Sequence, residues 1–256
     1  MDDVIEKGYA EVVPPEQLER KDGRIWYIPH HGVYHPEKQT LRVVFDCSAC
    51  YQGKSLNSEL LQGPDLTNSL IGVLLKFRKQ PVAVMADIRS MFHQVRVSAN
   101  DIDFLRFLWW PNGDVTKSPV EYRMLVHLFG ATSSPSCSSF ALKRNPEDNK
   151  AHFHPEIVNT INHNFYVDDC LKSSPSEQDA QQLVKNPTNA CRLGGFHLTK
   201  WVSNSRTVLS AIPEENRAKE VKMLDLDKEE LPMERALGLQ WNVENDTFVF
   251  KMTKSH

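Results

Sequence analysis

Two adjacent aspartates, Asp168 and Asp169, interrupt the otherwise apolar stretch FYVDDCL. Like charges held close together cost free energy unless water or a cation neutralises them. Neighbouring side chains of a strand face opposite ways, so both carboxylates can approach one ion only if the chain turns there. A hairpin with the two aspartates at its tip meets this requirement. A solvated surface turn is the alternative interpretation of this dipeptide.

Asp87 is the natural third member of this carboxylate group. It ends the valine-rich stretch PVAVMAD, which predicts a short buried strand. Mg²⁺ prefers oxygen ligands, commonly one or two carboxylates together with substrate phosphates. Two such ions about 3.5–4 Å apart can serve the attacking and leaving oxygens of phosphoryl transfer. The three aspartates therefore predict a site for two divalent ions, Mg²⁺ or Mn²⁺.

The elements that must position these residues form a mixed α+β pattern. Leu66, Leu70, Leu74 and Phe77 recur at helical spacing, which predicts a helix that ends before Pro81. Asn112-Gly113 favours the positive φ of a tight turn between two strands. Strands are predicted at 40–46, 81–87, 103–110, 120–126, 237–243 and 247–252, and helices at 65–78, 133–144 and 174–186. In the last helix, Ser174, Pro175 and Glu177 occupy capping-box positions, and Pro187 is expected to kink or break it.

Composition sets broad limits on the class of protein. The 256 residues carry a formal net charge of −3, which counts against wholesale electrostatic binding of nucleic acid and leaves a local basic groove as an open alternative. The five cysteines are too few and too scattered for a disulfide framework and favour a reducing compartment. No run approaches the roughly 18 apolar residues of a membrane span, so no membrane partner is expected.

Six ordered segments resemble the reverse transcriptases. YVDD is similar to their catalytic turn, and VMADIRSMFHQV resembles their other catalytic segment, an aspartate with an aromatic residue five positions on. LRVVFD resembles the fingers strand, HLFGATSSPSCSSFAL the segment under the nucleotide, GGFHLTKW a later palm segment and LGLQW the primer grip. The sequences of these segments most resemble those of the Bel/Pao class of LTR retrotransposons, notably RVVFDCSA, LNSELLQGPDL and FHLTKWVSNS.

The resemblance implies a role for each matching residue. Asp87 and Asp168 would bind both metal ions, and Asp169 would support the site. The backbone carbonyl of Ile88 would also reach a metal. The further residues implied at the site are Arg42 and Lys38 for phosphate, Phe92 against a ribose 2′-hydroxyl, Gly130 under the nucleotide, Lys200 near pyrophosphate, and Leu239, Gln240 and Trp241 at the primer end.

Each role has a structural alternative. Phe92 and Trp241 could be core residues, Arg42 could pair with Asp46, and Lys200 could be a solvated lysine. The sequence also departs from the family at Phe129, where many reverse transcriptases carry a glutamine.

The resemblance implies a right-hand-type polymerase with fingers, a palm built on an antiparallel sheet, and no thumb. The expected segments are 1–80 (fingers), 81–95 (palm), 96–129 (fingers) and 130–256 (palm with primer grip). The implied activity is RNA-directed DNA polymerisation. The implied partners are an RNA or DNA template with a primer, deoxynucleoside triphosphates and other domains of a polyprotein. The expected location is intracellular and cytoplasmic, in a virus-like particle.

Three rival interpretations remain open. His31 and His35 followed by Cys47 and Cys50 have the ligand types of a zinc-stabilised binding module. The chain could also be a catalytically silent relic or a co-opted nucleic-acid-binding protein. An RNA-dependent RNA polymerase is the third, although a bulky Phe92 would obstruct a ribonucleotide.

Overall fold

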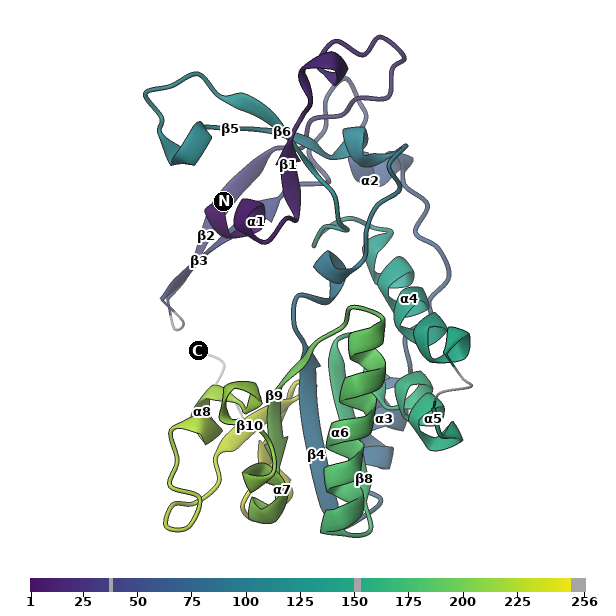
Figure 1. Ribbon diagram of the computed structural model, residues 1–256, viewed down its shortest axis with the longest axis vertical. Coiled ribbons are helices and arrows are strands. Elements are labelled where there is room, and N and C mark those ends of the chain that lie inside the picture. Colours follow the sequence, from purple (N-terminus) through teal and green to yellow (C-terminus); the bar gives the residue numbers. More distant parts are fainter. Residues whose placement is uncertain (37–38, 150–152, 250–256) are drawn as a thin grey trace, which may run out of the picture. The chain divides into compact units, whose positions relative to one another are not determined.

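The computed structural model in Figure 1 describes residues 1–36, 39–149 and 153–249. The chain divides into two compact units, and each unit combines two separate stretches of sequence. The first comprises Met1–Asp65 and Phe92–Ser138, and the second comprises Leu66–Met91 and the residues from Ser139 onward. The sequence predicted that the fingers and palm segments divide after residues 80, 95 and 129. The two units of the structure divide after residues 65, 91 and 138.

The first unit is built on a three-stranded antiparallel sheet and a separate hairpin. The sheet has the order β1 (Ala10–Val12), β6 (Val120–Met124) and β5 (Arg106–Trp109). The hairpin pairs β2 (His30–His35) with β3 (Thr40–Phe45), which confirms the predicted strand at 40–46. The core between them contains Ala10, Ile28, Phe45, Cys47, Leu56, Leu105, Phe107, Tyr122, Met124, Val126, Leu128 and Ala131.

The first unit also contains short helices and turns. They are α1 (Asp2–Glu6), α2 (Leu56–Glu59), the start of α4 (Ser134–Asp148), and 3₁₀ turns at Pro15–Gln17, Ile102–Leu105 and Pro111–Gly113. Asn112 and Gly113 have φ of 55° and 70°, as the Asn-Gly pair predicted. The strand predicted from residue 103 begins at Arg106, because Asp103 belongs to a 3₁₀ turn and faces arginines in the interior.

The second unit is organised around a four-stranded antiparallel sheet. Its order is β7 (Phe165–Tyr166), β8 (Asp169–Ser174), β4 (Val82–Ile88) and β9 (Leu198–Ser203). β4 lies in the interior of the sheet and is almost wholly buried, as its run of apolar residues predicted. Antiparallel pairing brings the end of β4 beside the start of β8, which places Asp87 opposite Asp169.

Helices cover this sheet. They are α3 (Leu70–Phe77), α5 (Pro155–His163), α6 (Glu177–Leu193) and α7 (Arg206–Ser210). The unit also contains α8 (Lys219–Lys222) and a 3₁₀ turn at Glu214–Asn216, and the 3₁₀ turn Met91–Gln94 lies at the boundary with the first unit. The long helix α6 runs along β4 and β8 and packs against both, as Figure 1 shows. α3 packs against β8 and therefore belongs to this unit.

A second sheet in this unit follows β9. β10 (Met233–Ala236), β11 (Leu239–Asn242) and β12 (Thr247–Val249) pair antiparallel in that order. The last two confirm the strands predicted around residues 244–246, and residues 250–252 of that prediction lie outside the described residues.

Three helix predictions need correction. α3 begins at Leu70 rather than residue 65, because the hydroxyl of Ser69 accepts a hydrogen bond from the backbone of Gly72 and caps the helix there. The cap of α6 is Ser176 rather than Ser174, because Ser174 is still paired with Val82 at the end of β8.

Pro187 neither breaks nor ends α6, which continues to Leu193. A proline removes one backbone hydrogen bond from a helix interior. The helix is buried on both sides of the proline, at Ala180 before it and at Ala190 and Cys191 after it. The free energy of this packing outweighs the loss of one hydrogen bond. Within residues 1–36, 39–149 and 153–249, no helix is long and apolar enough to cross a membrane.

Candidate active site

The FYVDDCL segment forms a tight hairpin in the second unit. Tyr166 pairs with Asp169 across β7 and β8, so Val167 and Asp168 are the two residues of the loop. Val167 has a φ of 54°. A β-branched residue with positive φ is a genuine outlier, and such strain persists where the surrounding structure enforces it. The predicted hairpin is confirmed, but only Asp168 lies at its tip: Asp169 was predicted there too and is instead the first residue of β8, because it pairs with Tyr166.

The hairpin brings three carboxylates to one end of the sheet. Asp87 and Asp169 are directly opposed on β4 and β8, and opposed residues project from the same face. The backbone N–H of Ile88 donates to the carbonyl of Asp168 at 2.8 Å, which fixes the loop against the end of β4. Ile88 and Asp168, 80 positions apart in the sequence, thus become neighbours.

Burial and mutual repulsion disfavour the charged forms of both hairpin aspartates. Burial raises the pKa of Asp169 to about 7, with further contributions from Asp168 and Asp87. Burial also raises the pKa of Asp168, and the charge of Asp87 acts in the same direction. The positive charge of Lys200 opposes both shifts. The carboxylate group is therefore short of positive charge.

Lys200 reaches this group from β9. Its Nζ donates to Oδ2 of Asp87 at 2.6 Å. The register between β4 and β9 shifts between Met85 and Asp87, so two residues of β9 face one residue of β4. Lys200 lies in this bulge with a φ of 55°. Bulges next to active sites often re-aim a side chain, and this one directs the lysine at the carboxylates.

The donor chemistry suits a hard divalent cation, because carboxylate oxygens are what Mg²⁺ prefers. The distances between the carboxylates do not by themselves form a complete ion site. Among the residues that the structure describes, no group of three or more His, Cys, Asp or Glu side chains lies close enough to hold a metal ion. Asp87, Asp168 and Asp169 therefore fit such an ion by type, and the lysine ammonium faces one of them.

Of the residues predicted to contact the nucleotide, Arg42, Phe92 and Gly130 lie in the first unit and Lys200 lies in the second. Arg42 is exposed on β3 and forms no ion pair within the described part of the chain. Its predicted alternative partner, Asp46, instead accepts a hydrogen bond from the backbone N–H of Ser48 at 3.0 Å. Lys38 lies outside the described residues.

Phe92 and Gly130 have well-defined surroundings in the first unit. The ring of Phe92 packs against that of Phe129, with centroids 4.6 Å apart. Gly130 has a φ of 98°, and a Cβ there would lie 3.3 Å from the carbonyl oxygen of Phe45. Both the backbone angle and the close approach favour glycine at this position.

Asn57 is a positioning residue that was not predicted from the sequence. Its Nδ2 donates to the carbonyl of Gly130 at 2.9 Å, and its Oδ1 accepts from the backbone N–H of Thr132 at 2.9 Å. The side chain therefore holds both ends of the Gly130 turn. The available signal was its place in the quoted segment LNSELLQGPDL.

The predicted primer-grip residues lie on or beside β11. Trp241 is fully buried, packs edge-to-face on Phe77 at 4.9 Å and donates from Nε1 to Asp246 at 2.9 Å. Leu239 and Gln240 are half-buried. The structure thus gives Trp241 a packing role, and the contact of Leu239 and Gln240 with a primer stays a prediction.

The zinc interpretation of the first unit is not supported. His31 and His35 lie on β2, where they pair with Val44 and Thr40. Cys47 is buried, and burial raises the pKa of its thiol to about 11, which disfavours a thiolate ligand. These residues form no metal-binding group in the described chain.

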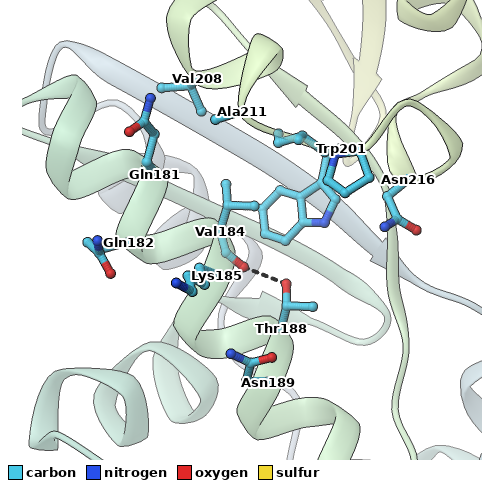
Figure 2. A pocket seen from close by; sticks show the side chains of 12 residues that line it. Gln181, Gln182, Val184, Lys185, Thr188, Asn189, Trp201, Val208, Ala211 and Asn216 are labelled. Atoms are coloured by element: carbon cyan, nitrogen blue, oxygen red, sulfur yellow. Dashed lines mark hydrogen bonds between the residues drawn. The ribbon is translucent and has the colours of Figure 1, made fainter.

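The carboxylates do not line the pocket shown in Figure 2. This cavity of about 390 Å³ lies among α6, α7 and β9 and has Trp201 in its wall. Figure 2 shows the indole of Trp201 beside Val184, with the amides of Gln181, Asn189 and Asn216 around it. The pocket is relevant to the site because Trp201 follows Lys200 in the bulge.

No protein-family model and no curated protein matches the chain. Among solved structures, a foamy viral protease-reverse transcriptase in complex with double-stranded DNA is similar, with a TM-score of 0.51 and 15% sequence identity. The match covers 77% of this chain and 29% of that chain. The fold resembles part of a protease-reverse transcriptase. At this identity the likeness concerns the fold alone, a mixed α/β arrangement with antiparallel sheets.

Proposed function

We propose that the chain is the fingers and palm of an RNA-directed DNA polymerase of the Bel/Pao retrotransposon type. It would add deoxynucleotides to the 3′ end of a primer. The observation that carries this proposal is the convergence of Asp87, Asp168 and Asp169 at one end of an antiparallel sheet. The similar fold of the protease-reverse transcriptase supports it independently of these residues.

In this proposal the second unit acts as the palm and the first as the fingers. Asp87, Asp168 and Asp169 would hold two ions of Mg²⁺ or Mn²⁺, with the carbonyl of Ile88 as a further donor. When bound, such ions would acidify the primer 3′-hydroxyl and neutralise the leaving pyrophosphate. The strained loop at Val167 would hold Asp168 at the tip of the hairpin before any ion binds.

The remaining residues would bind and select the nucleotide. Arg42 and Lys38 would contact its phosphates, because a guanidinium fork pairs well with phosphate oxygens. Phe92, held by Phe129, would exclude a ribose 2′-hydroxyl, and Gly130 would let the backbone approach the nucleotide. Lys200 would lie near the pyrophosphate, and Leu239 and Gln240 would place the primer end.

The proposed partners follow from this activity. They are an RNA or DNA template with a primer, deoxynucleoside triphosphates, and other domains of a polyprotein. The template would be held mainly through its backbone and helical shape. We place the protein inside the cell, in a cytoplasmic virus-like particle.

Primer extension tests the proposal. The purified chain is given a DNA primer on an RNA template at low salt, first with Mg²⁺ and then with Mn²⁺. Duplex binding is measured on the same samples. We expect extension by the wild type and none by Asp168→Asn, with equal binding by both. Extension by Asp168→Asn would refute the metal-ligand role.

Non-catalytic nucleic-acid binding is the second candidate function. The observation in its favour is that no three potential ligands lie close enough to hold an ion in the described residues. Binding of duplex without extension under either metal ion would select this candidate.

A further inference from the structure

The ion pair between Lys200 and Asp87 depends on an unusual piece of backbone. A lysine at the middle of a strand normally has an extended conformation, yet Lys200 has a φ of 55°. The left-handed region is unfavourable for an ordinary residue, because its Cβ comes too close to the following carbonyl oxygen. The bulge and the left-handed backbone of Lys200 together place its ammonium 2.6 Å from Oδ2 of Asp87.

The neighbours of Lys200 hold the bulge in place. Thr199 is 7% exposed and Trp201 is 2% exposed, whereas the Lys200 side chain is 65% exposed. The Trp201 indole lies against Val184 of α6, as Figure 2 shows. The strand is therefore anchored on its helix side, and the flexible lysine side chain can reach the carboxylates or extend into solvent.

The position of the ammonium matters because it faces a carboxylate proposed to bind metal. Asp87 is 24% exposed and pairs with Lys200 alone among the described residues. An ammonium at hydrogen-bond distance from Oδ2 and a divalent ion about 2.0–2.1 Å from the same carboxylate repel each other as like charges.

We propose that Lys200 is a resident counter-cation of the carboxylate group, which a divalent ion must displace from Asp87. This inference rests on the proposed metal role of the three aspartates. Without an ion, the lysine neutralises Asp87 and keeps the end of β4 ordered. On ion binding, the Lys200–Asp87 contact opens and the side chain moves into solvent, free to meet an anionic substrate.

The Lys200–Asp87 ion pair lowers the affinity of the carboxylate group for its first divalent ion. Exposed ion pairs contribute modestly, so removing the lysine should tighten metal binding by about two- to fivefold. The matched control is Lys172, which is also a strand lysine in an ion pair, with Glu156 at 3.1 Å. Its carboxylate partner is not one of the three aspartates, so Lys172→Met should leave metal affinity unchanged.

Mn²⁺ binding to the full chain tests the inference. Free Mn²⁺ is followed by its electron paramagnetic resonance signal in the wild type, Lys200→Met, Lys200→Gly, Lys172→Met and Asp168→Asn. The glycine variant suits the positive φ and guards against misfolding of the methionine variant. We expect tighter binding in both Lys200 variants, no change in Lys172→Met and weak binding in Asp168→Asn.

A second measurement follows the wild-type lysine directly. Mg²⁺ is titrated into protein labelled with ¹³C at the lysine Cε, and the Lys200 resonance is assigned by its loss in Lys200→Met. We expect this resonance to move as Mg²⁺ binds, while the resonance assigned by Lys172→Met stays fixed.

The outcomes separate this inference from the proposed function. Mn²⁺ binding that Asp168→Asn abolishes, with equal affinity in the wild type and both Lys200 variants, would overturn the counter-cation role and leave the metal site standing. An unmoved Lys200 resonance during Mg²⁺ binding would overturn it as well. Absence of Mn²⁺ binding in every protein would remove both the metal site and its counter-cation.

Discussion

Two residues beside the proposed metal site have left-handed backbone angles, Val167 at 54° and Lys200 at 55°. Neither is a residue type that favours this region, so the fold must enforce both. The sequence predicted that Asp87, Asp168 and Asp169 lie together, because apolar strands that end in aspartates are visible in the pattern. It could not predict the contact of Lys200 with Asp87, because that contact needs a bulge that no local pattern encodes.

The pH dependence of stability follows from Asp169. Its pKa of about 7 in the folded chain exceeds its ordinary value of 3.8, because burial and two neighbouring carboxylates disfavour the charge. A carboxyl group with a raised folded pKa contributes stability that is present below about pH 4 and is lost as the pH rises through 7. We expect Asp169→Asn to gain about 4 kcal/mol over the wild type between pH 4 and pH 8.

Urea unfolding in metal-free buffer at both pH values measures this difference. Asp148→Asn, an exposed aspartate of α4, is the control and should show no such trend. A constant difference between Asp169→Asn and the wild type across this range would contradict the assigned pKa.

Phe92 carries the prediction on sugar selection. Phe92→Ala should raise ribonucleotide relative to deoxynucleotide incorporation by about tenfold or more, because the proposed obstruction to a 2′-hydroxyl is removed. The ratio of incorporation rates with matched triphosphates measures the effect, and Phe140→Ala, an exposed phenylalanine on α4, serves as control. An unchanged ratio in Phe92→Ala would leave this residue with packing against Phe129 as its role.

At the scale of elements, periodicity predicted what a local pattern can encode. The strands at Thr40–Phe45, Val82–Ile88 and Leu239–Asn242 follow from apolar and β-branched runs. The start of α6 does not, because Ser174 and Ser176 both offer capping hydroxyls in sequence. Strand pairing of Ser174 with Val82 decides between them, and that pairing is a long-range contact.

Ser176 should therefore carry the capping energy of α6. Its hydroxyl accepts a hydrogen bond from the backbone N–H of Asp179 at 3.2 Å. Ser176→Ala should lower the free energy of unfolding by about 1 kcal/mol in urea, because an N-terminal N–H loses its partner. Ser210→Ala, at the end of α7, should cost less, and equal losses in both variants would contradict the cap assignment.

At the scale of the whole molecule, each unit is assembled from two separate stretches of chain. A sequence read in order cannot fix where such units divide, because the division depends on which distant segments pack together. The first unit shows this in its buried charges. Asp103 is 1% exposed and accepts hydrogen bonds from Arg20, Arg106 and Arg123, which come from three places in the sequence.

Removing the charge of Asp103 should therefore be costly. Burial alone would raise the pKa of Asp103, but the hydrogen bonds from the three arginines hold it below the ordinary value. Asp103→Asn should destabilise the protein by about 3–5 kcal/mol in urea, because buried guanidinium groups lose their counter-charge. Asp101→Asn breaks an exposed pair with Arg24 and should cost less than about 1 kcal/mol. Similar costs for the two variants would contradict the buried network.

We propose that the aspartates at the end of the four-stranded sheet perform nucleotide addition. The most direct test is the rate of single-nucleotide addition to a DNA primer on an RNA template in excess Mg²⁺, compared between wild type, Asp87→Asn and Asp148→Asn. We expect a measurable rate in the wild type and Asp148→Asn and no detectable addition by Asp87→Asn, with all three proteins binding the duplex equally. Addition by Asp87→Asn at the wild-type rate would contradict this proposal.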